Sequence, residues 1–438
     1  MLLFSRPGLP QILFINTMLA AVRTAAASKS AFASMRSFSG SASIRPARWA
    51  SPVISGLSGG LSGVRSSVHT PRRLFSTVKT AEVILVGCGA PDKGMGWYHA
   101  VQMLDGKVPS SNLTSIIEPY FLGAGASSDA GVDFAAWQGE VEADHEVKFL
   151  KSLSDLPVVD PKTSPRVALI SGRTADNPAL LTSSIAAGCN TIYLEKPGAP
   201  TVAELQSMKQ EAAANNVTVL MGYNKNVCKY VSKVRDFASK NEGLVTFVSN
   251  NAYENTKESL GECFERNSEG MLKNMAIHEL ALLVSFYDVT VENIASVVAD
   301  KEFSSVQTLA GPSGEERTDF DKIKFTITTK SGKQVSVAAD RCGGSDSYAT
   351  VVNDGKEIFK YSMPDEEDEI MVAEIQGRFP NAMPYFFPQD PDYITVKERV
   401  SSFCATGKEA EGVATIDIGV ETLRVAEFLT PELQKQLA

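Results

Sequence analysis

The stretch that most constrains the fold is a short apolar run that ends in glycines. Val83–Gly89 (VILVGCG) is followed by Gly96 and then by a segment with helical spacing. Strand, tight glycine turn and helix N-terminus form the opening unit of a dinucleotide-binding fold. Glycine is needed because the backbone must turn sharply and let a pyrophosphate approach the free N–H groups of the helix end. Six residues separate Gly89 from Gly96, so an ordinary turn without a ligand is the alternative.

An acidic residue closes the next apolar run. Leu113–Ile117 is followed by Glu118, about thirty residues past the glycine turn. At the end of the second strand of a dinucleotide-binding fold, a carboxylate accepts hydrogen bonds from the ribose hydroxyls and repels a 2′-phosphate. No Arg lies beside Glu118, so the sequence favours NAD(H) over NADP(H). The alternative is an acid that only caps the turn after a strand.

Apolar runs then alternate with helical patterns up to residue 225. The runs are Val167–Ile170, Thr191–Leu194 and Val217–Met221, and Thr201–Asn215 has the spacing of a helix. This alternation predicts an α/β domain over residues 80–225, with a Rossmann-type, doubly wound parallel sheet. Such sheets bind ligands at the carboxyl ends of their strands. The residues expected there are Gly87, Glu118, Ser171, Glu195 and Gly222.

From residue 226 the pattern changes to helices and then to a run of strands. Helices are expected over Lys229–Lys240 and Met271–Phe286, and hairpin turns at Ser331-Gly332 and Asn353-Asp354-Gly355. Strands joined by hairpins pair in an antiparallel manner. The sequence therefore predicts a second, α+β domain over residues 226–438, with a mostly antiparallel open sheet.

Residues 1–79 have the composition of a targeting segment. Up to residue 80 the chain has ten basic side chains and no Asp or Glu. A basic, Ser- and Ala-rich head without acids is typical of an organelle transit peptide, which we expect to lack fixed structure. The run Arg72-Arg73-Leu74-Phe75-Ser76 is typical of a mitochondrial processing site. We therefore expect the mitochondrial matrix, with a plastid as the alternative.

The rest of the chain is acidic and has no paired cysteines. Residues 81–438 hold 32 of the 42 basic side chains and all 51 acidic ones, a net charge of about −19. Such a charge repels nucleic acid and anionic membranes, and we expect neither as a partner. The six cysteines lie far apart without a CxxC pair. This favours reduced thiols and predicts no zinc or other metal site.

Taken together, four motifs resemble those of the Gfo/Idh/MocA family of oxidoreductases, which includes glucose–fructose oxidoreductase and inositol dehydrogenase. The resemblance covers residues 80–438. The motifs are Gly96-x-x-His99, the strand Val167–Ile170 leading to Ala187-Gly188, Glu195-Lys196-Pro197 with Thr201 behind it, and His278 in a second-domain helix. The resemblance implies a Rossmann domain and an open, mostly antiparallel sheet, with substrate bound between them against the nicotinamide.

The resemblance also implies two catalytic residues. Lys196 matches the family lysine beside the nicotinamide and the reacting hydroxyl, where an ammonium steers the oxygen and stabilises its developing charge. His278 matches the general acid/base, which takes the hydroxyl proton as hydride leaves the same carbon. A structural role is the alternative for both, as a surface lysine and as a core histidine.

Further residues follow from the glycine turn and the resemblance. Asn274 stands one helical turn before His278, where many members have an Asp that orients the histidine; an amide supplies no charge. With Lys225, it is expected to contact the substrate. Asn177 stands where the family often has a histidine beside the cofactor. The set expected to bind NAD, with NADP less favoured, is Gly87, Gly89, Gly96, Glu118, Ser171, Gly172, Asn177 and Glu195.

The predicted function is an NAD(P)-dependent oxidoreductase acting on a secondary alcohol or ketone of a sugar, cyclitol or polyol. Reduction of another carbonyl or of an imine is an alternative on the same scaffold. A different class is also open: a cofactor-binding sensor that has lost turnover. Lys196 and His278 speak against the sensor, and Asn274 leaves it open. The family habit of pairing through the open sheet predicts a homo-oligomer.

Overall fold

The computed structural model describes residues 79–161 and 163–438. The predicted transit peptide, residues 1–79, lies outside the described residues apart from Lys79. The described residues belong to one compact unit that contains two β-sheets. None of the helices in this part of the chain has the length and apolar character needed to cross a membrane.

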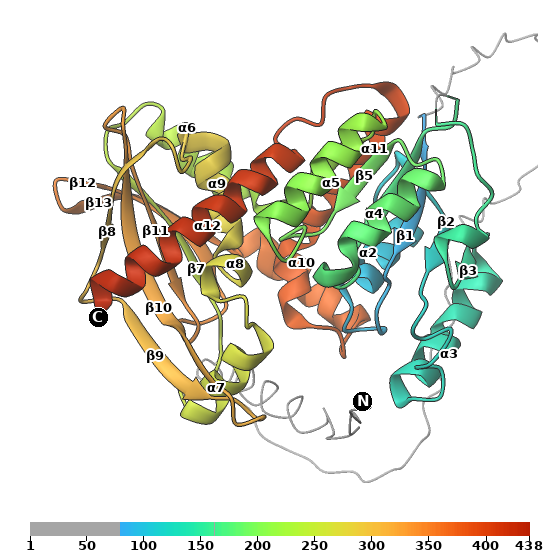
Figure 1. The fold of residues 1–438 in the computed structure, drawn as a ribbon, viewed down its shortest axis with the longest axis horizontal. Helices are drawn as coiled ribbons and strands as arrows, with labels where there is room; N and C mark the ends of the chain where they lie inside the picture. The colour runs from blue at the N-terminus through green and yellow to red at the C-terminus, as the bar shows by residue number, and fades with distance from the viewer. Residues whose placement is uncertain (1–78, 162) are drawn as a thin grey trace, which may run out of the picture. The chain divides into compact units, whose positions relative to one another are not determined.

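The first sheet confirms the predicted doubly wound architecture (Figure 1). It has six strands in the order β3-β2-β1-β4-β5-β6, all parallel, which is the strand order of a dinucleotide-binding sheet. Its central strands are apolar along their length because helices cover both faces of a parallel sheet. The strands are β1 (Ala81–Val86), β2 (Ser111–Ile117), β3 (Lys148–Leu150), β4 (Arg166–Ile170), β5 (Thr191–Leu194) and β6 (Thr218–Met221).

Helices connect these strands. Glycine precedes α2 at its N-terminus, whereas Ser128 and Thr201 cap the next helix and the last one with side-chain hydrogen bonds. The α-helices are α2 (Met95–Leu104), α3 (Asp129–Asp144), α4 (Asn177–Ala186) and α5 (Val202–Ala214). Short 3₁₀ turns are η1 (Leu153–Asp155), η2 (Thr174–Asp176) and η3 (Asn224–Val227).

The second sheet is the predicted, mostly antiparallel one. Its order is β13-β12-β7-β11-β10-β8, with β9 paired to β10, and only β7 and β11 pair in parallel. Val337, Phe325 and Phe247 are buried on one face, where α9 packs against β7 and β11. The strands are β7 (Leu244–Asn250), β8 (Ile294–Ala299), β9 (Ser305–Ala310), β10 (Glu316–Thr329), β11 (Gln334–Asp340), β12 (Ser347–Asn353) and β13 (Lys356–Met363).

The helix expected over Met271–Phe286 is divided in two. The break follows Asn274, where the amide of Ala276 bonds the Met271 carbonyl at 3.0 Å, a wider turn than that of an α-helix. The two pieces are α8 (Met271–Asn274) and α9 (Ile277–Tyr287). They are preceded by α6 (Lys229–Ala238) and α7 (Lys257–Arg266). Asn274 and His278 therefore lie on different helices.

The C-terminal quarter of the chain returns to the first sheet. The helix α11 packs against β1, β2, β4 and β5, and α12 contacts α5 and β6 as well as α9 and β8 (Figure 1). The elements are α10 (Glu366–Arg378), η4 (Pro384–Gln389), α11 (Asp390–Thr406) and α12 (Ile416–Leu437). The division into residues 80–225 and 226–438 stays a prediction; the contacts add that α11, from the second range, covers a face of the first sheet.

Candidate active site

The glycine turn after β1 is closely packed. Gly87 and Gly89 have φ of +82° and +74°, which side chains other than glycine rarely adopt. A Cβ on Gly87 would lie 2.6 Å from the Cα of Gly172, and one on Gly96 would lie 2.1 Å from the Gly87 carbonyl oxygen. The start of α2 and the turns after β1 and β4 therefore approach one another as closely as backbone allows. This is the geometry in which helix N–H groups can meet a pyrophosphate.

Gly94 is a member of this turn that the sequence analysis missed. It is the residue before α2, and its added Cβ would lie 2.6 Å from the carbonyl oxygen of Cys88. The signal was present in the spacing Gly94-x-Gly96. The long insertion therefore folds within the turn, with the Gly94 amide bonded to the Ala90 carbonyl at 2.8 Å.

Glu118 is buried at the end of β2 and bonds backbone of the glycine turn. Its Oε2 accepts a hydrogen bond from the Gly89 amide at 2.9 Å, and its Oε1 accepts one from the Tyr120 amide at 3.1 Å. The turn-capping contact that we considered as the alternative is thus present. The ribose contact stays a prediction, and the carboxylate has further lone pairs for it.

Asn177 and Ser171 follow β4 at the same edge of the sheet. The side chain of Asn177 is buried, and its Nδ2 donates to the Gly198 carbonyl at 2.9 Å. Its Oδ1 has no partner within the described residues, so a buried acceptor remains available there. The Ser171 amide continues the ladder by bonding the Val86 carbonyl. The bond of Asn177 thus links the segment after β4 to the turn after β5, and the bond of Ser171 links it to the end of β1.

Lys196 follows β5, and its surroundings disfavour its charge. Burial lowers the pKa of Lys196, and the nearby carboxylates of Glu195 and Glu269 oppose that effect. Its Nζ donates to the main-chain carbonyl of Asn274 at 3.5 Å. Lys196 is thus held against the break between α8 and α9 and is not the freely solvated lysine of the structural alternative.

His278 lies in the first turn of α9, within the electrostatic reach of Lys196. Burial lowers the pKa of His278 well below its usual value, and the charges of Lys196 and Lys225 lower it further. Its Nδ1 is buried and has no hydrogen-bond partner among the described residues. The ring of Tyr223 stands edge-on to it, with the centroids 6.0 Å apart. The imidazole is therefore neutral near pH 7 and free to accept a proton.

Asn274 does not contact His278 through a side-chain hydrogen bond. Its Nδ2 donates instead to Glu269 Oε1 at 2.7 Å. Glu269 is exposed, and no motif had singled it out. The position at which the family often has an Asp thus carries an amide, and a neighbouring carboxylate supplies negative charge near Lys196.

Lys225, expected to contact substrate, is enclosed by protein. Its Nζ donates to Glu279 at 2.5 Å and to the hydroxyls of Ser249 and Ser347, both at 3.2 Å. An ammonium has three N–H donors, and these contacts use all of them. Glu279 is fully buried, and neither residue's pairing could be seen in the sequence. The substrate contact of Lys225 stays a prediction.

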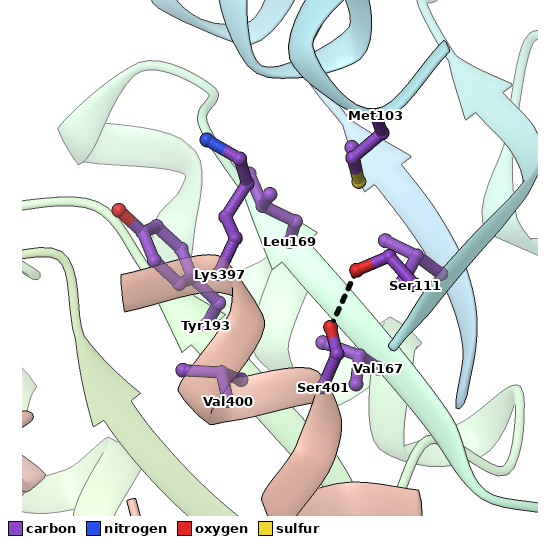
Figure 2. Close-up of a pocket in the computed structure, with 9 residues that line it drawn as sticks. Met103, Ser111, Val167, Leu169, Tyr193, Lys397, Val400 and Ser401 are labelled. Carbon is purple, nitrogen blue, oxygen red and sulfur yellow. Dashed lines mark hydrogen bonds between the residues drawn. The ribbon is translucent and has the colours of Figure 1, made fainter. Parts of the chain in front are cut away.

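A cavity behind this edge is too small for substrate or cofactor. It lies between the first sheet and α11 and has a volume of about 10 Å³, which leaves room for about one water molecule. Lys397 and Tyr193 line it, together with Ser111 and Ser401, whose hydroxyls are 2.7 Å apart. In Figure 2 the polar ends of Lys397 and Tyr193 point to the same side, away from the two serines.

No group of three or more His, Cys, Asp or Glu side chains in residues 79–161 and 163–438 is arranged to hold a metal ion. No protein-family model and no curated protein matches the sequence. Solved structures do match, and those reported next are all dehydrogenases.

A myo-inositol dehydrogenase from Corynebacterium glutamicum shares 16% identity, with a TM-score of 0.56 over 82% of this chain and 96% of that one. A scyllo-inositol dehydrogenase from Lactobacillus casei, solved with bound NAD(H) and scyllo-inositol, shares 12% identity, with a TM-score of 0.56 over 81% and 97%. A UDP-N-acetylglucosamine 3-dehydrogenase from Acidithiobacillus ferrooxidans shares 12% identity, with a TM-score of 0.53 over 82% and 99%. The fold implied by the Gfo/Idh/MocA resemblance is therefore confirmed.

Proposed function

We propose that the chain is an NAD(H)-dependent oxidoreductase that interconverts a secondary alcohol and a ketone of a sugar, cyclitol or polyol. The observation that carries the proposal is that Lys196 lies within the electrostatic reach of His278 and is held by the carbonyl of Asn274. Burial lowers the pKa of both, and the charge of Lys196 further lowers the pKa of His278. Perturbed groups that act on one another are typical of catalytic sites. The fold shared with inositol and sugar-nucleotide dehydrogenases supports the substrate class.

The turns at the sheet edge fit a dinucleotide. A Cβ at Gly87 or Gly96 would clash with the backbone of the neighbouring turn, so only glycines allow this close packing, and Asn177 Oδ1 is a buried acceptor without a partner among the described residues. Glu118 would receive the ribose hydroxyls, which favours NAD(H) over NADP(H). When bound, the dinucleotide supplies the nicotinamide ring that exchanges hydride with the substrate carbon.

Two side chains of this chain then act on the substrate hydroxyl. Lys196, held by the Asn274 carbonyl, donates a hydrogen bond to the substrate oxygen and stabilises the negative charge that develops on it. His278, neutral near pH 7, accepts the hydroxyl proton during oxidation and returns it during reduction. The lowered pKa of His278 makes its protonated form a stronger acid, which favours the return of the proton during reduction.

The proposal is tested with the full chain in two steps. NADH and NADPH are titrated by fluorescence, and polyols, cyclitols and sugar acids are then screened with NAD⁺ by absorbance at 340 nm. We expect tighter binding of NADH and turnover of at least one substrate. We expect His278→Asn and Lys196→Ala each to lower kcat by roughly 10²- to 10⁴-fold.

Two exposed residues provide matched controls. His145→Gln and Lys233→Ala change the same residue types on the surface and should retain activity. NADH binding without turnover across the panel would favour the sensor. Absence of binding for both nucleotides would refute the interpretation of the glycine turn.

Location and assembly are part of the proposal. We place the mature protein in the mitochondrial matrix as a homo-oligomer, without nucleic acid or membrane as a partner. Residues 1–79 fused to a fluorescent protein should reach mitochondria, and import into plastids would overturn this assignment. Light scattering of the purified chain should give a mass that is a multiple of 47.0 kDa or of the processed chain.

A further inference from the structure

A buried row of charged side chains lies behind Lys196. Both ring nitrogens of His99 are used: Nε2 lies 3.0 Å from Glu195 Oε1, and Nδ1 lies 2.9 Å from Lys397 Nζ. His99 is fully buried, and Lys397 is 2% exposed. Lys397 also donates to the side-chain carbonyl of Gln102. The row joins α2, the end of β5 and α11, which are far apart in the sequence.

The partners determine where the hydrogens lie. Glu195 is ionised, because the hydrogen bonds of His99 and Tyr193 and the charge of Lys196 outweigh burial and leave its pKa lowered. An ionised carboxylate only accepts hydrogen bonds, so His99 Nε2 must carry the hydrogen and donate it. His99 is neutral, since burial and the charge of Lys397 lower its pKa to about 4. Its Nδ1 is therefore an acceptor, and Lys397 is the donor to it.

We propose that His99 is a positioning residue, which Lys397 holds in the Nε2–H tautomer and which keeps Glu195 ionised and in place beside Lys196. The role of Lys196 in this statement rests on the proposed function. Tyr193 supports the arrangement by donating its hydroxyl hydrogen to the same Oε1 at 2.8 Å. Glu195 then acts on Lys196, because its negative charge raises a pKa that burial lowers.

The row holds charge in place and is not a route for protons. Beyond Lys397 the next contact is Gln102, whose Nε2 donates to Asp390 Oδ1 at 2.6 Å. An amide does not exchange protons in the way an imidazole does, so the path to Lys107, 3.2 Å from Asp390, is interrupted. What continues through the row is alternating charge, from Lys107 through Asp390, Lys397 and Glu195 to Lys196. Burial lowers the pKa of Lys397 to about 7, so its part of the positive charge is full only below that pH.

The other titratable groups around Glu195 and Lys196 leave this assignment intact. Tyr223, Tyr385 and Tyr393 lie within the electrostatic reach of Glu195. Burial of Tyr223 and Tyr393 and the charge of Glu195 on all three raise their pKa values, so all three stay protonated. The groups facing Lys196, besides Glu195 and His278, are Glu269, Lys225 and Glu279. Lys225 and Glu279 bond each other, and Glu269 is exposed. Glu195 is thus the carboxylate in this set that is neither exposed like Glu269 nor paired with a lysine like Glu279; its side chain is 14% exposed.

Two substitutions separate positioning from proton transfer. His99→Gln offers an amide that can donate to Glu195 and a carbonyl that can accept from Lys397, so it repeats the pattern of the Nε2–H tautomer. His99→Leu removes both bonds. Because glutamine cannot carry a proton, a proton relay would fail in both variants, whereas positioning would fail in His99→Leu alone.

The readout is the pKa of Lys196 itself. Trace acetylation of the full chain at a series of pH values, followed by peptide mass spectrometry, measures the reactivity of individual lysines without any substrate. We expect His99→Leu to lower the pKa of Lys196 by about one unit and His99→Gln to leave it near that of the parent. With a substrate, the alkaline limb of kcat should move by the same amount. An unchanged Lys196 in His99→Leu, or equal shifts in both variants, would overturn the proposal.

Nitrogen-15 NMR of the histidines tests the tautomer independently of activity. The full chain has four histidines, and the signal of His99 is identified by its absence in His99→Gln. We expect a neutral Nε2–H ring from pH 5.5 to 8 in the parent. In Lys397→Met the pKa of His99 should rise, because a positive neighbour is lost. An Nδ1–H ring, or a His99 that titrates near pH 6.5 in the parent, would contradict the proposal. Both readouts stand even where no substrate is found, so their failure differs from failure of the proposed function.

Discussion

Two buried clusters of charged side chains act on Lys196, and they are built differently. In the first, Glu279 and two serine hydroxyls use all three donors of Lys225, while Glu279 Oε2 has no hydrogen-bond partner among the described residues. In the second, Glu195 is bonded by His99 and Tyr193, neither of which neutralises it. The first cluster presents Lys196 with a positive and a negative charge that offset each other. The second places the negative charge of Glu195, which no cation in the cluster offsets, beside Lys196.

The difference suggests separate roles for the two clusters: the Lys225–Glu279 pair affects the stability of the fold, and Glu195 affects the reactivity of Lys196. A buried ion pair adds little to stability beyond an apolar pair of the same shape, but it is costly to break. A carboxylate held by neutral donors keeps its charge available for a third group. We expect the Lys225 cluster to respond mainly in unfolding experiments and the Glu195 cluster mainly in the pKa of Lys196.

The largest expected effect comes from breaking the closed pair. Lys225→Met leaves Glu279 fully buried without a cation, which should cost about 3–5 kcal/mol in the free energy of unfolding. The double variant Lys225→Met/Glu279→Leu removes both charges and should recover most of that loss. Urea unfolding of the three proteins provides the measurement.

An exposed lysine on a neighbouring helix is the control. Lys233→Met should change the free energy of unfolding by less than about 0.5 kcal/mol. A Lys225→Met protein as stable as this control would show that the cluster is not a buried pair. If Lys225 contacts substrate, as the resemblance implies, KM would rise in the single variant and stay high in the double one.

The second prediction concerns acid and the His99 row. In the folded protein the pKa of His99 is lowered to about 4 by burial and by Lys397, whereas an unfolded histidine titrates near 6.5. Between these values the unfolded chain binds the extra proton, so stability is lost as the pH falls from 6.5 to 4. The loss from this residue should be about 3 kcal/mol.

The measurement is a difference between two proteins. Urea unfolding of the parent and of His99→Gln at pH 7 and pH 4.5 should show a smaller acid loss in the variant, because glutamine does not titrate. His145→Gln, at an exposed position, should lose as much stability as the parent. Equal acid losses in the parent and in His99→Gln would mean that His99 is not the neutral, buried ring seen here.

Local sequence patterns were enough to predict the first sheet and the residues at its edge, but not the buried partners of Glu195. The first sheet could be predicted because its strands are continuous apolar runs, and the place of Glu195 and Lys196 at its edge because they directly follow one of them; the role of Lys196 came only from the resemblance and stays a prediction. His99 entered through a motif, without a role. Lys397 could not be found: its partner His99 lies 298 residues away, and a lysine in an amphipathic helix looks like a surface residue until the sheet covers it.

The second sheet region was less predictable for a related reason. The break between α8 and α9 has no proline or glycine to mark it, and it lies where the two helices pack against the second sheet and α12. A continuous helix would have put Asn274 one turn from His278 on the same face. In the structure Asn274 turns to Glu269.

The smallest expected effect is the change in the pKa of Lys196 when Glu269 is replaced, and it best separates the influence of an exposed carboxylate from that of Glu195. Both Glu195 and Glu269 raise the pKa of Lys196 against burial, but Glu269 is exposed and its charge is screened by solvent and salt. Glu269→Gln should lower the pKa of Lys196 by roughly 0.2–0.7 units at low ionic strength. The shift should vanish in 1 M salt, where the screening length is about 3 Å. The shift caused by His99→Leu should persist there, because the Glu195 row is buried.

Acetylation of Lys196 at the two salt concentrations measures both shifts in one experiment. Glu242→Gln removes an exposed carboxylate from the turn between α6 and β7 and serves as the control, with no shift at either concentration. A Glu269 effect that survives high salt would mean that its bond to Asn274 shields it from solvent. The amide at position 274 would then have a function of its own: to hold a carboxylate beside Lys196 where many relatives place one directly. A shift that salt abolishes leaves Glu195 as the carboxylate that sets the reactivity of Lys196.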